Sequence, residues 1–71
     1  MKRSEVIAKA LRDGMDEGDL NQADVARKSG LSQKQIGLIL AGKIRQPHPT
    51  TINALRNAVP GFSQRYDAVA A

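Results

Sequence analysis

Residues 20–42 read LNQADVARKSGLSQKQIGLILAG, and this stretch predicts two short helices joined by a tight turn. Asn21 suits the position before the first helix, because its side chain can accept a hydrogen bond from the backbone N–H of Asp24 or Ala23. Gly30 suits the turn, since glycine readily adopts the left-handed conformation that ends a helix. The stretch therefore has residues suited to begin a first helix, to end it in a turn and to lead into a second helix.

The second of these helices has an apolar face and a polar face. Ser32 and Gln35 have the spacing of a capping box, so this helix is expected to begin directly after Ser32. Its apolar stripe is formed at the i, i+3, i+4 spacing by Ile36, Ile39 and Leu40. The outer face is left to Gln33, Lys34, Gly37 and Leu38. Amides and amines read base edges in the major groove, so this face favours binding of double-stranded DNA.

A helix is also expected near the amino terminus. Ser4 is a suitable N-cap, and apolar residues continue at helical spacing until Gly14, which is expected to end the helix. An acidic loop over residues 15–20 would follow. Its carboxylates do not have the spacing of a calcium-binding loop, so no metal site is predicted there.

Two helical segments are expected after the central stretch. Prolines at two positions make residues 43–49 a loop, and a fourth helix should start at Thr50 or Thr51 and stop at Pro60. The tail, residues 62–71, is expected to form one or two last helical turns. One side of these turns would carry Phe62, Tyr66 and Val69. The predicted fold is therefore all-α, a compact bundle of about five short helices.

The charge of the chain is unevenly distributed. The net charge is +4, yet the forty residues from Arg27 to Tyr66 hold seven basic side chains and no Asp or Glu, whereas residues 1–26 hold six acidic and four basic ones. Segregated positive charge favours a polyanion as partner, although charge alone fits an ordinary basic surface equally well. Three cations outside the polar helix face are expected to be merely solvated: Lys9, Arg12 and Arg56.

Composition excludes several classes of protein. The 71 residues allow one small domain, and no cysteine is present to form a disulfide or a thiolate metal site. No apolar run approaches the length of a membrane span and no signal-peptide core follows Met1, so the expected location is the cytoplasm.

His48, the only histidine, has no acid or nucleophile beside it. No catalytic motif is present, so we expect no enzyme activity, no cofactor, no metal and no small-molecule ligand.

The run from Leu20 to Ile36 resembles the DNA-binding domain of the lambdoid phage repressor and Cro family, as do the Ala-Gly-Lys at residues 41–43 and the helix pattern of residues 52–59. The similarity covers roughly residues 4–61. Its features follow one another in a fixed order: a Gln that opens a helix, an interior Ala, a turn Gly, a capped Gln-rich helix, a Gly-Lys pair and a Thr-led helix. The resemblance implies a lambda repressor-like helix-turn-helix fold.

The resemblance also implies roles for individual side chains. Gln22 would contact a backbone phosphate at the start of its helix. Gln33 would pair with an adenine edge, and Lys34 would reach guanine acceptors or a phosphate. Leu38 stands where such proteins usually have a polar residue, so it would contact a thymine methyl group or else pack inward. Further contacts to the DNA backbone would come from Ser32, Gln35, Lys43 and Arg45. The alternative for the two glutamines of this helix is a cap and a solvated face.

The predicted function is a sequence-specific regulator of transcription, a Cro-like repressor of phage or prophage type. One recognition helix contacts few base pairs, so a homodimer on a palindromic operator is expected. The DNA-binding domain would span residues 1–61. The tail would supply the dimer contact through Phe62, Tyr66 and Val69, unless this stripe packs within the molecule. Two alternatives stay open: an antitoxin that binds its own operator and a toxin, and a protein-binding helix-turn-helix module without DNA contact.

Overall fold

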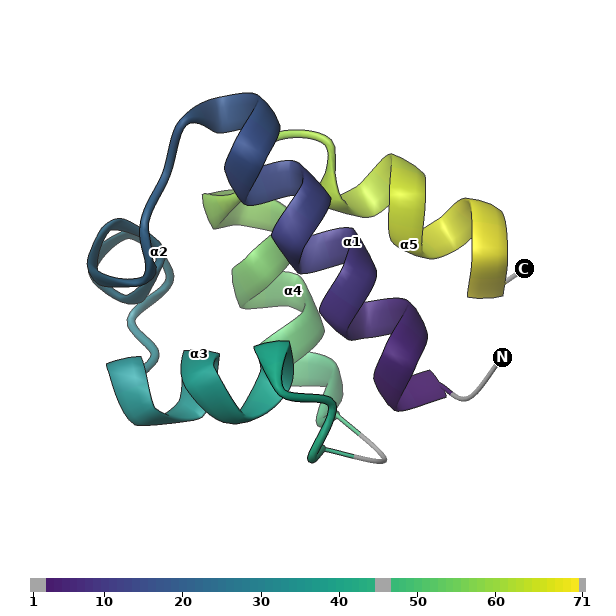
Figure 1. Cartoon of the computed structure of the whole chain (residues 1–71), viewed down its shortest axis with the longest axis horizontal. Helices are drawn as coiled ribbons and strands as arrows, with labels where there is room; N and C mark the ends of the chain where they lie inside the picture. The colour runs from purple at the N-terminus through teal and green to yellow at the C-terminus, as the bar shows by residue number, and fades with distance from the viewer. Residues whose placement is uncertain (1–2, 45–46, 71) are drawn as a thin grey trace.

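The computed structural model describes residues 3–44 and 47–70, and these residues form a bundle of helices (Figure 1). The helices are α1 (Arg3–Gly18), α2 (Gln22–Ser29), α3 (Gln33–Leu40), α4 (Pro49–Ala58) and α5 (Phe62–Ala70). The described residues contain no strand, which confirms the predicted all-α bundle of five helices. None of these helices combines the length and the apolar character needed to cross a membrane.

α1 is longer than the sequence predicts. It continues through Gly14 to Gly18, and Met15, which was expected to open a loop, is buried in the core. Gly14 is buried because Val59 packs directly on it: a Cβ atom at residue 14 would lie 2.6 Å from Val59 Cγ1. The predicted helix end at Gly14 is therefore wrong, since this glycine serves close packing between helices.

Two helix starts also differ from the prediction. Ser4 does not precede α1 but lies in its first turn, where its side chain is buried. α4 begins at Pro49, before Thr50, and its N-cap is His48, whose Nδ1 accepts a hydrogen bond of 3.3 Å from the Thr50 N–H. Proline suits the first position of a helix because its missing N–H would have no partner there.

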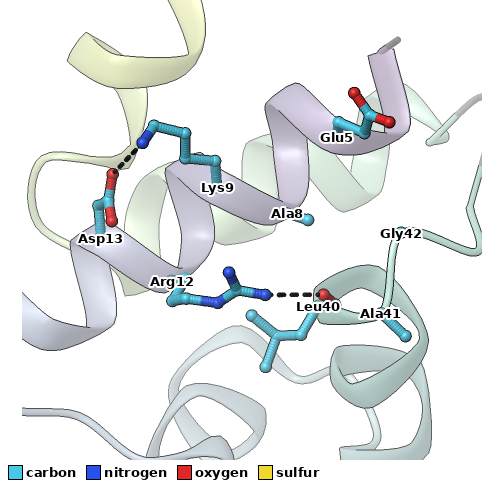
Figure 2. Close-up of a pocket in the computed structure, with 8 residues that line it drawn as sticks. All are labelled: Glu5, Ala8, Lys9, Arg12, Asp13, Leu40, Ala41 and Gly42. Atoms are coloured by element: carbon cyan, nitrogen blue, oxygen red, sulfur yellow. Dashed lines mark hydrogen bonds and ion pairs between the residues drawn. The ribbon is translucent and has the colours of Figure 1, made fainter. Parts of the chain in front are cut away.

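α1 crosses the carboxyl end of α3. At the crossing, Arg12 Nη2 donates a hydrogen bond of 3.3 Å to the carbonyl oxygen of Leu40, the last residue of α3 (Figure 2). The sequence predicts only a solvated charge at Arg12. This residue is exposed, but it also joins α1 to α3 through a partner 28 positions away in the chain.

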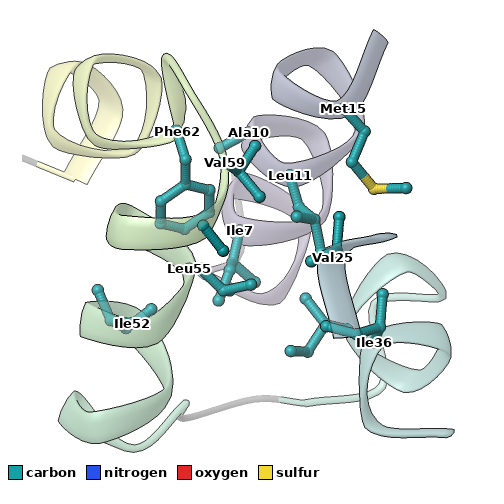
Figure 3. Close-up of a cluster of buried hydrophobic side chains, with 12 residues drawn as sticks. Ile7, Ala10, Leu11, Met15, Val25, Ile36, Ile52, Leu55, Val59 and Phe62 are labelled. Atoms are coloured by element: carbon teal, nitrogen blue, oxygen red, sulfur yellow. The ribbon is translucent and has the colours of Figure 1, made fainter. Parts of the chain in front are cut away.

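The core is aliphatic except for one ring. Its fully buried side chains come from all five helices or the residue after α4: Ile7, Leu11, Val25, Ile36, Ile39, Leu55, Val59 and Phe62. Phe62 is the first residue of α5 and points into the space between α1 and α4 (Figure 3). The boundary that the sequence suggests after residue 61 therefore runs through a shared core.

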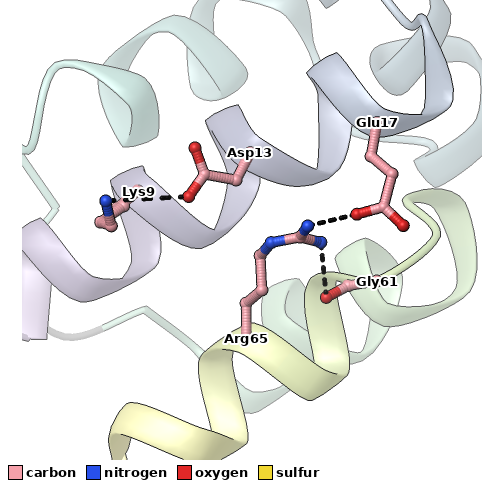
Figure 4. Close-up of polar contacts among 5 residues, drawn as sticks. All are labelled: Lys9, Asp13, Glu17, Gly61 and Arg65. Carbon is pink, nitrogen blue, oxygen red and sulfur yellow. Dashed lines mark hydrogen bonds and ion pairs between the residues drawn. The ribbon is translucent and has the colours of Figure 1, made fainter.

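Polar contacts fasten α5 to α1 and α4. Arg65 pairs with Glu17 of α1 and also donates to the carbonyl oxygen of Gly61 (Figure 4). On the other side of α5, the Arg56 guanidinium of α4 binds both carboxylate oxygens of Asp67, at 2.6 and 2.8 Å. These hydrogen bonds lower the pKa of Asp67. Arg56, expected to be solvated, is thus part of the helix packing.

Candidate nucleic-acid interface

The start of α2 is fixed by a complete capping box. Asn21 Oδ1 accepts the Asp24 N–H at 2.8 Å, and the Asp24 carboxylate accepts the Asn21 N–H at 3.1 Å. Two N–H groups that the helix itself cannot satisfy are thereby bonded. The predicted cap at Asn21 is confirmed. Gln22, the first residue of α2, is exposed at this helix start.

The turn between α2 and α3 depends on the backbone of Gly30. This residue has a φ of 80°, and its N–H donates to the carbonyl oxygen of Ala26 at 2.9 Å. A Cβ atom at residue 30 would meet nothing within 4 Å, so glycine is required here by the left-handed conformation and not by space. The predicted left-handed turn is confirmed.

The start of α3 carries half of the predicted capping box. Ser32 Oγ accepts the Gln35 N–H at 3.1 Å, which confirms Ser32 as the N-cap. The return bond, which the Ser32 N–H would donate to the Gln35 side-chain oxygen, is absent from the described contacts, so the box predicted for this helix is incomplete. A serine hydroxyl that accepts one bond still has its own O–H to donate.

The described polar residues of the predicted interface lie at the surface. Gln22, Ser32, Gln33, Lys34 and Lys43 are exposed, and Gln35 is half-buried. Arg45 lies outside the described residues.

The amino end of α2 lies beside α3. Gln22 Oε1 is 3.7 Å from the point where a Cβ atom of Gly37 would stand, so its amide lies next to the middle of α3. α2 and α3 thus present one continuous surface at this point, in the arrangement of a helix-turn-helix.

Leu38 is half-buried, and it is not one of the described side chains that pack on the core cluster. Its three apolar neighbours in α3 behave differently: Ile36 and Ile39 are fully buried, and Leu40 packs against the core. The orientation of α3 therefore separates Leu38 from the apolar stripe.

Fewer of the cations in residues 27–66 are free to bind a polyanion than the sequence suggests. Three of its arginines pair with carboxylates that lie outside this stretch of sequence: Arg27 with Asp24, Arg56 with Asp67 and Arg65 with Glu17. In the described part of the chain, no carboxylate pairs with Lys28, Lys34 or Lys43. Within residues 27–66, these three described lysines without a carboxylate partner lie on α2, on α3 and just after α3.

The side chains predicted to form a dimer contact are not equally accessible. Phe62 has no exposed surface, so it belongs to the core and cannot touch a second copy in this fold. Tyr66 is half-buried and stacks on Phe62, with ring centroids 5.5 Å apart and planes 9° apart. The side chain of Val69 lies outside the described part of the chain. The intramolecular alternative thus holds for Phe62.

Three side chains have structural roles that the sequence does not predict. Arg12 and Arg56 act across helices, which local patterns do not reveal. His48 caps α4, and this role had a local signal, since a polar side chain stands just before the proline that opens the helix.

Among the residues that the structure describes, no group of three or more His, Asp or Glu side chains could hold a metal ion.

Comparison with known proteins agrees with this geometry. A family model described as helix-turn-helix matches residues 9–59, from the middle of α1 to the residue after α4. No curated protein and no solved structure matches the chain. The family match covers well over half of the 71 residues. The chain therefore belongs to the lambda repressor/Cro-like helix-turn-helix family of DNA-binding transcriptional regulators.

Proposed function

We propose that this protein recognises a specific sequence of double-stranded DNA by inserting α3 into the major groove, and that it acts as a Cro-like repressor. One observation carries the proposal: Gln33 and Lys34 are exposed in the first turn of α3, directly after the cap at Ser32. The recognition helix of a helix-turn-helix contacts bases through residues of its amino-terminal part. An amide and an amine at this position are suited to adenine and guanine edges.

Three side chains are proposed to read bases. Gln33 would use its amide as both donor and acceptor on adenine, and Lys34 would donate to guanine O6 or N7. Leu38 would contact a thymine methyl group, because it lies apart from the apolar stripe of α3 and is only partly buried. This supports the outward role over the inward one that the sequence left open.

The DNA backbone would be held by residues at both ends of this surface. Gln22 stands at the start of α2, where free N–H groups and the helix dipole favour a phosphate. Lys43 follows α3 and pairs with no described carboxylate. Further backbone contacts are proposed for Ser32, Gln35 and Arg45.

A homodimer on a palindromic operator is proposed because a single α3 can reach only a few base pairs. Two copies related by a two-fold axis would place their recognition helices about 34 Å apart, one turn of B-DNA. Of the predicted contact residues, Tyr66 keeps a partly exposed side chain and supports this role best. The proposal leaves Phe62 in the core.

Selection of bound duplexes from a random library at moderate salt tests the proposal. We expect enrichment of a pseudo-palindrome with fixed half-site spacing, and loss of one base preference in each of the variants Gln33→Ala and Lys34→Ala. Enrichment of a single half-site would remove the dimer but keep sequence recognition. Binding without enrichment, or no binding, would contradict sequence recognition and favour a protein partner such as a toxin.

A further inference from the structure

We infer that Arg12 is a positioning residue for DNA recognition: from α1, it holds the carboxyl end of the recognition helix and the turn that carries Lys43. The inference rests on the proposed function, because it assigns a role in that same DNA-binding surface. It concerns a residue that does not belong to the helix-turn-helix elements α2 and α3.

The first observation concerns the backbone carbonyl groups at the end of α3. The last four carbonyls of a helix have no partner inside the helix. Those of residues 37–39 accept hydrogen bonds of 3.0 Å from the N–H groups of residues 41–43, in a turn that requires a φ of 72° at Gly42. The carbonyl of Leu40 accepts its hydrogen bond from Arg12. With the bond from Arg12, each of the last four carbonyl groups of α3 therefore accepts a hydrogen bond.

The second observation concerns charge. The carboxyl end of a helix carries a partial negative charge, and a cation stabilises it. α2 has Arg27 and Lys28 in its own last turn, whereas α3 has no basic residue in its last turn. The guanidinium of Arg12 supplies this missing cation from α1.

The third observation is the position of Arg12 in a shallow groove between α1 and the end of α3. Around it lie Glu5, Lys9 and Asp13 on α1 and residues 40–42 at the end of α3 (Figure 2). Lys9 pairs with Asp13 of its own helix, at 3.9 Å. No described carboxylate competes for Arg12 by forming an ion pair with it. Among these cations only Arg12 bonds to α3 in the described structure.

This placement links Arg12 to specificity. The amino end of α3 is fixed by Ser32, and its carboxyl end is tied to α1 through Arg12. A shift of the carboxyl end would move Leu38 and Lys43 relative to Gln33. Base readout needs all these contacts at once, whereas attraction between cations and phosphates tolerates the shift.

The experiment compares Arg12→Met with Lys9→Met. Both variants lose one cation from the exposed side of α1 and keep an unbranched apolar stem, but only the first loses the bond to α3. We expect Arg12→Met to lower the ratio of specific to non-specific DNA affinity by about two- to fivefold, the size of a cation effect at a helix end. The slope of log affinity against log salt for the specific site should be the same in the two variants. Arg12→Lys should recover part of the ratio, because an ammonium group can also donate to the last carbonyls.

Amide hydrogen exchange without DNA separates this inference from the proposed function. We expect the N–H groups of Gly42 and Lys43 to exchange about two- to fivefold faster in Arg12→Met than in Lys9→Met, with α2 unchanged. Equal exchange in the two variants would overturn the positioning role. A salt slope lower by about 0.9 in Arg12→Met alone would also overturn it, since Arg12 would then be a phosphate contact itself. If the wild-type protein binds no DNA, the proposed function fails, and faster exchange would still establish that Arg12 holds the end of α3 but not that it serves DNA recognition.

Discussion

Val59 lies directly on Gly14, so that a Cβ atom at residue 14 would come within 2.6 Å of Val59 Cγ1 and 3.2 Å of the Pro60 carbonyl oxygen. Alanine favours a helix over glycine by roughly 1 kcal/mol, but overpacking a buried contact costs about 1–3 kcal/mol. Because these two effects oppose each other, we expect Gly14→Ala to lower the free energy of unfolding by up to about 2 kcal/mol, measured by urea denaturation.

Gly18→Ala is the matched control for this prediction. It makes the same substitution in the same helix, but its nearest contacts would be ordinary ones, at 3.4 Å to Leu20 Cδ1 and 3.5 Å to Pro60 Cδ. Its stability should stay within about 0.5 kcal/mol of wild type. If both variants were equally stable, close packing at Gly14 would not be what keeps glycine there.

His48 caps α4, so its replacement should weaken the start of this helix. We expect His48→Ala to lower the free energy of unfolding by about 0.5–1 kcal/mol, because the Thr50 N–H loses its acceptor. His48→Ser should restore stability, since serine is a good N-cap. Thermal unfolding at neutral pH measures both. An equal loss in the serine variant would show that the imidazole matters for a reason other than capping.

The bond between Asp67 and Arg56 predicts a dependence of stability on pH. Hydrogen bonds from Arg56 lower the pKa of Asp67 in the folded state, so its contribution is fully present above the unfolded carboxyl pKa near pH 4 and is lost as pH falls through the lower folded value. Asp67→Asn lacks this contribution at every pH. We therefore expect the difference in stability between wild type and Asp67→Asn to shrink below about pH 4. If the stabilities of wild type and Asp67→Asn differed by the same amount from about pH 2 to 7, the link between the Asp67–Arg56 bond and pH would be excluded.

Tyr66 contributes to the fold as well as to the proposed dimer contact. It stacks on Phe62, and the Arg56 guanidinium lies 5.9 Å from its ring centroid. Tyr66→Ala should therefore lower the free energy of unfolding by about 1–3 kcal/mol, whereas Tyr66→Phe should keep the ring contacts. Urea denaturation measures the loss. Dimerisation is then measured separately, by titrating the operator at several protein concentrations under conditions in which each variant is folded.

Gln33 and Lys43 should affect DNA binding in different ways. We expect Gln33→Ala to weaken binding to the selected operator by about 1–3 kcal/mol and to change the preferred base, with no change in salt dependence. Lys43→Ala should weaken all sequences alike and reduce the slope of log affinity against log salt by about 0.9. Titrations at four salt concentrations measure both. If instead Gln33→Ala reduced the salt slope and Lys43→Ala changed the preferred base, Lys43 would read a base and Gln33 would contact a phosphate.

Local chemistry explains what the sequence could predict. The caps at Asn21 and Ser32 and the left-handed turn at Gly30 involve partners at most four residues away, so their spacing in the sequence is informative. The apolar stripe of α3 followed from its period in the same way. These features define the helix-turn-helix and the orientation of its polar face.

Long-range contacts explain what the sequence could not predict. The sequence predicts a helix end at Gly14 because the packing partner of this glycine, Val59, is remote in the chain. The sequence does not reveal the contacts of Arg12 and Arg56, because their partners lie on other helices. An amphipathic stripe such as that of α5 has the same period whether its partner is the same molecule or another one, so the period could not assign Phe62 to the core.

Phe62 makes α5 part of the unit that folds with the helix-turn-helix. The segment shared with the family ends at residue 59, three positions before Phe62, the largest fully buried side chain among the described residues. A transplant of residues 9–59 alone, for example to build a chimeric DNA-binding protein, would remove Phe62 from the space between α1 and α4 and would also remove the fully buried Ile7. The unit that must be moved together is therefore longer than the unit that sequence comparison delimits, and it includes α5.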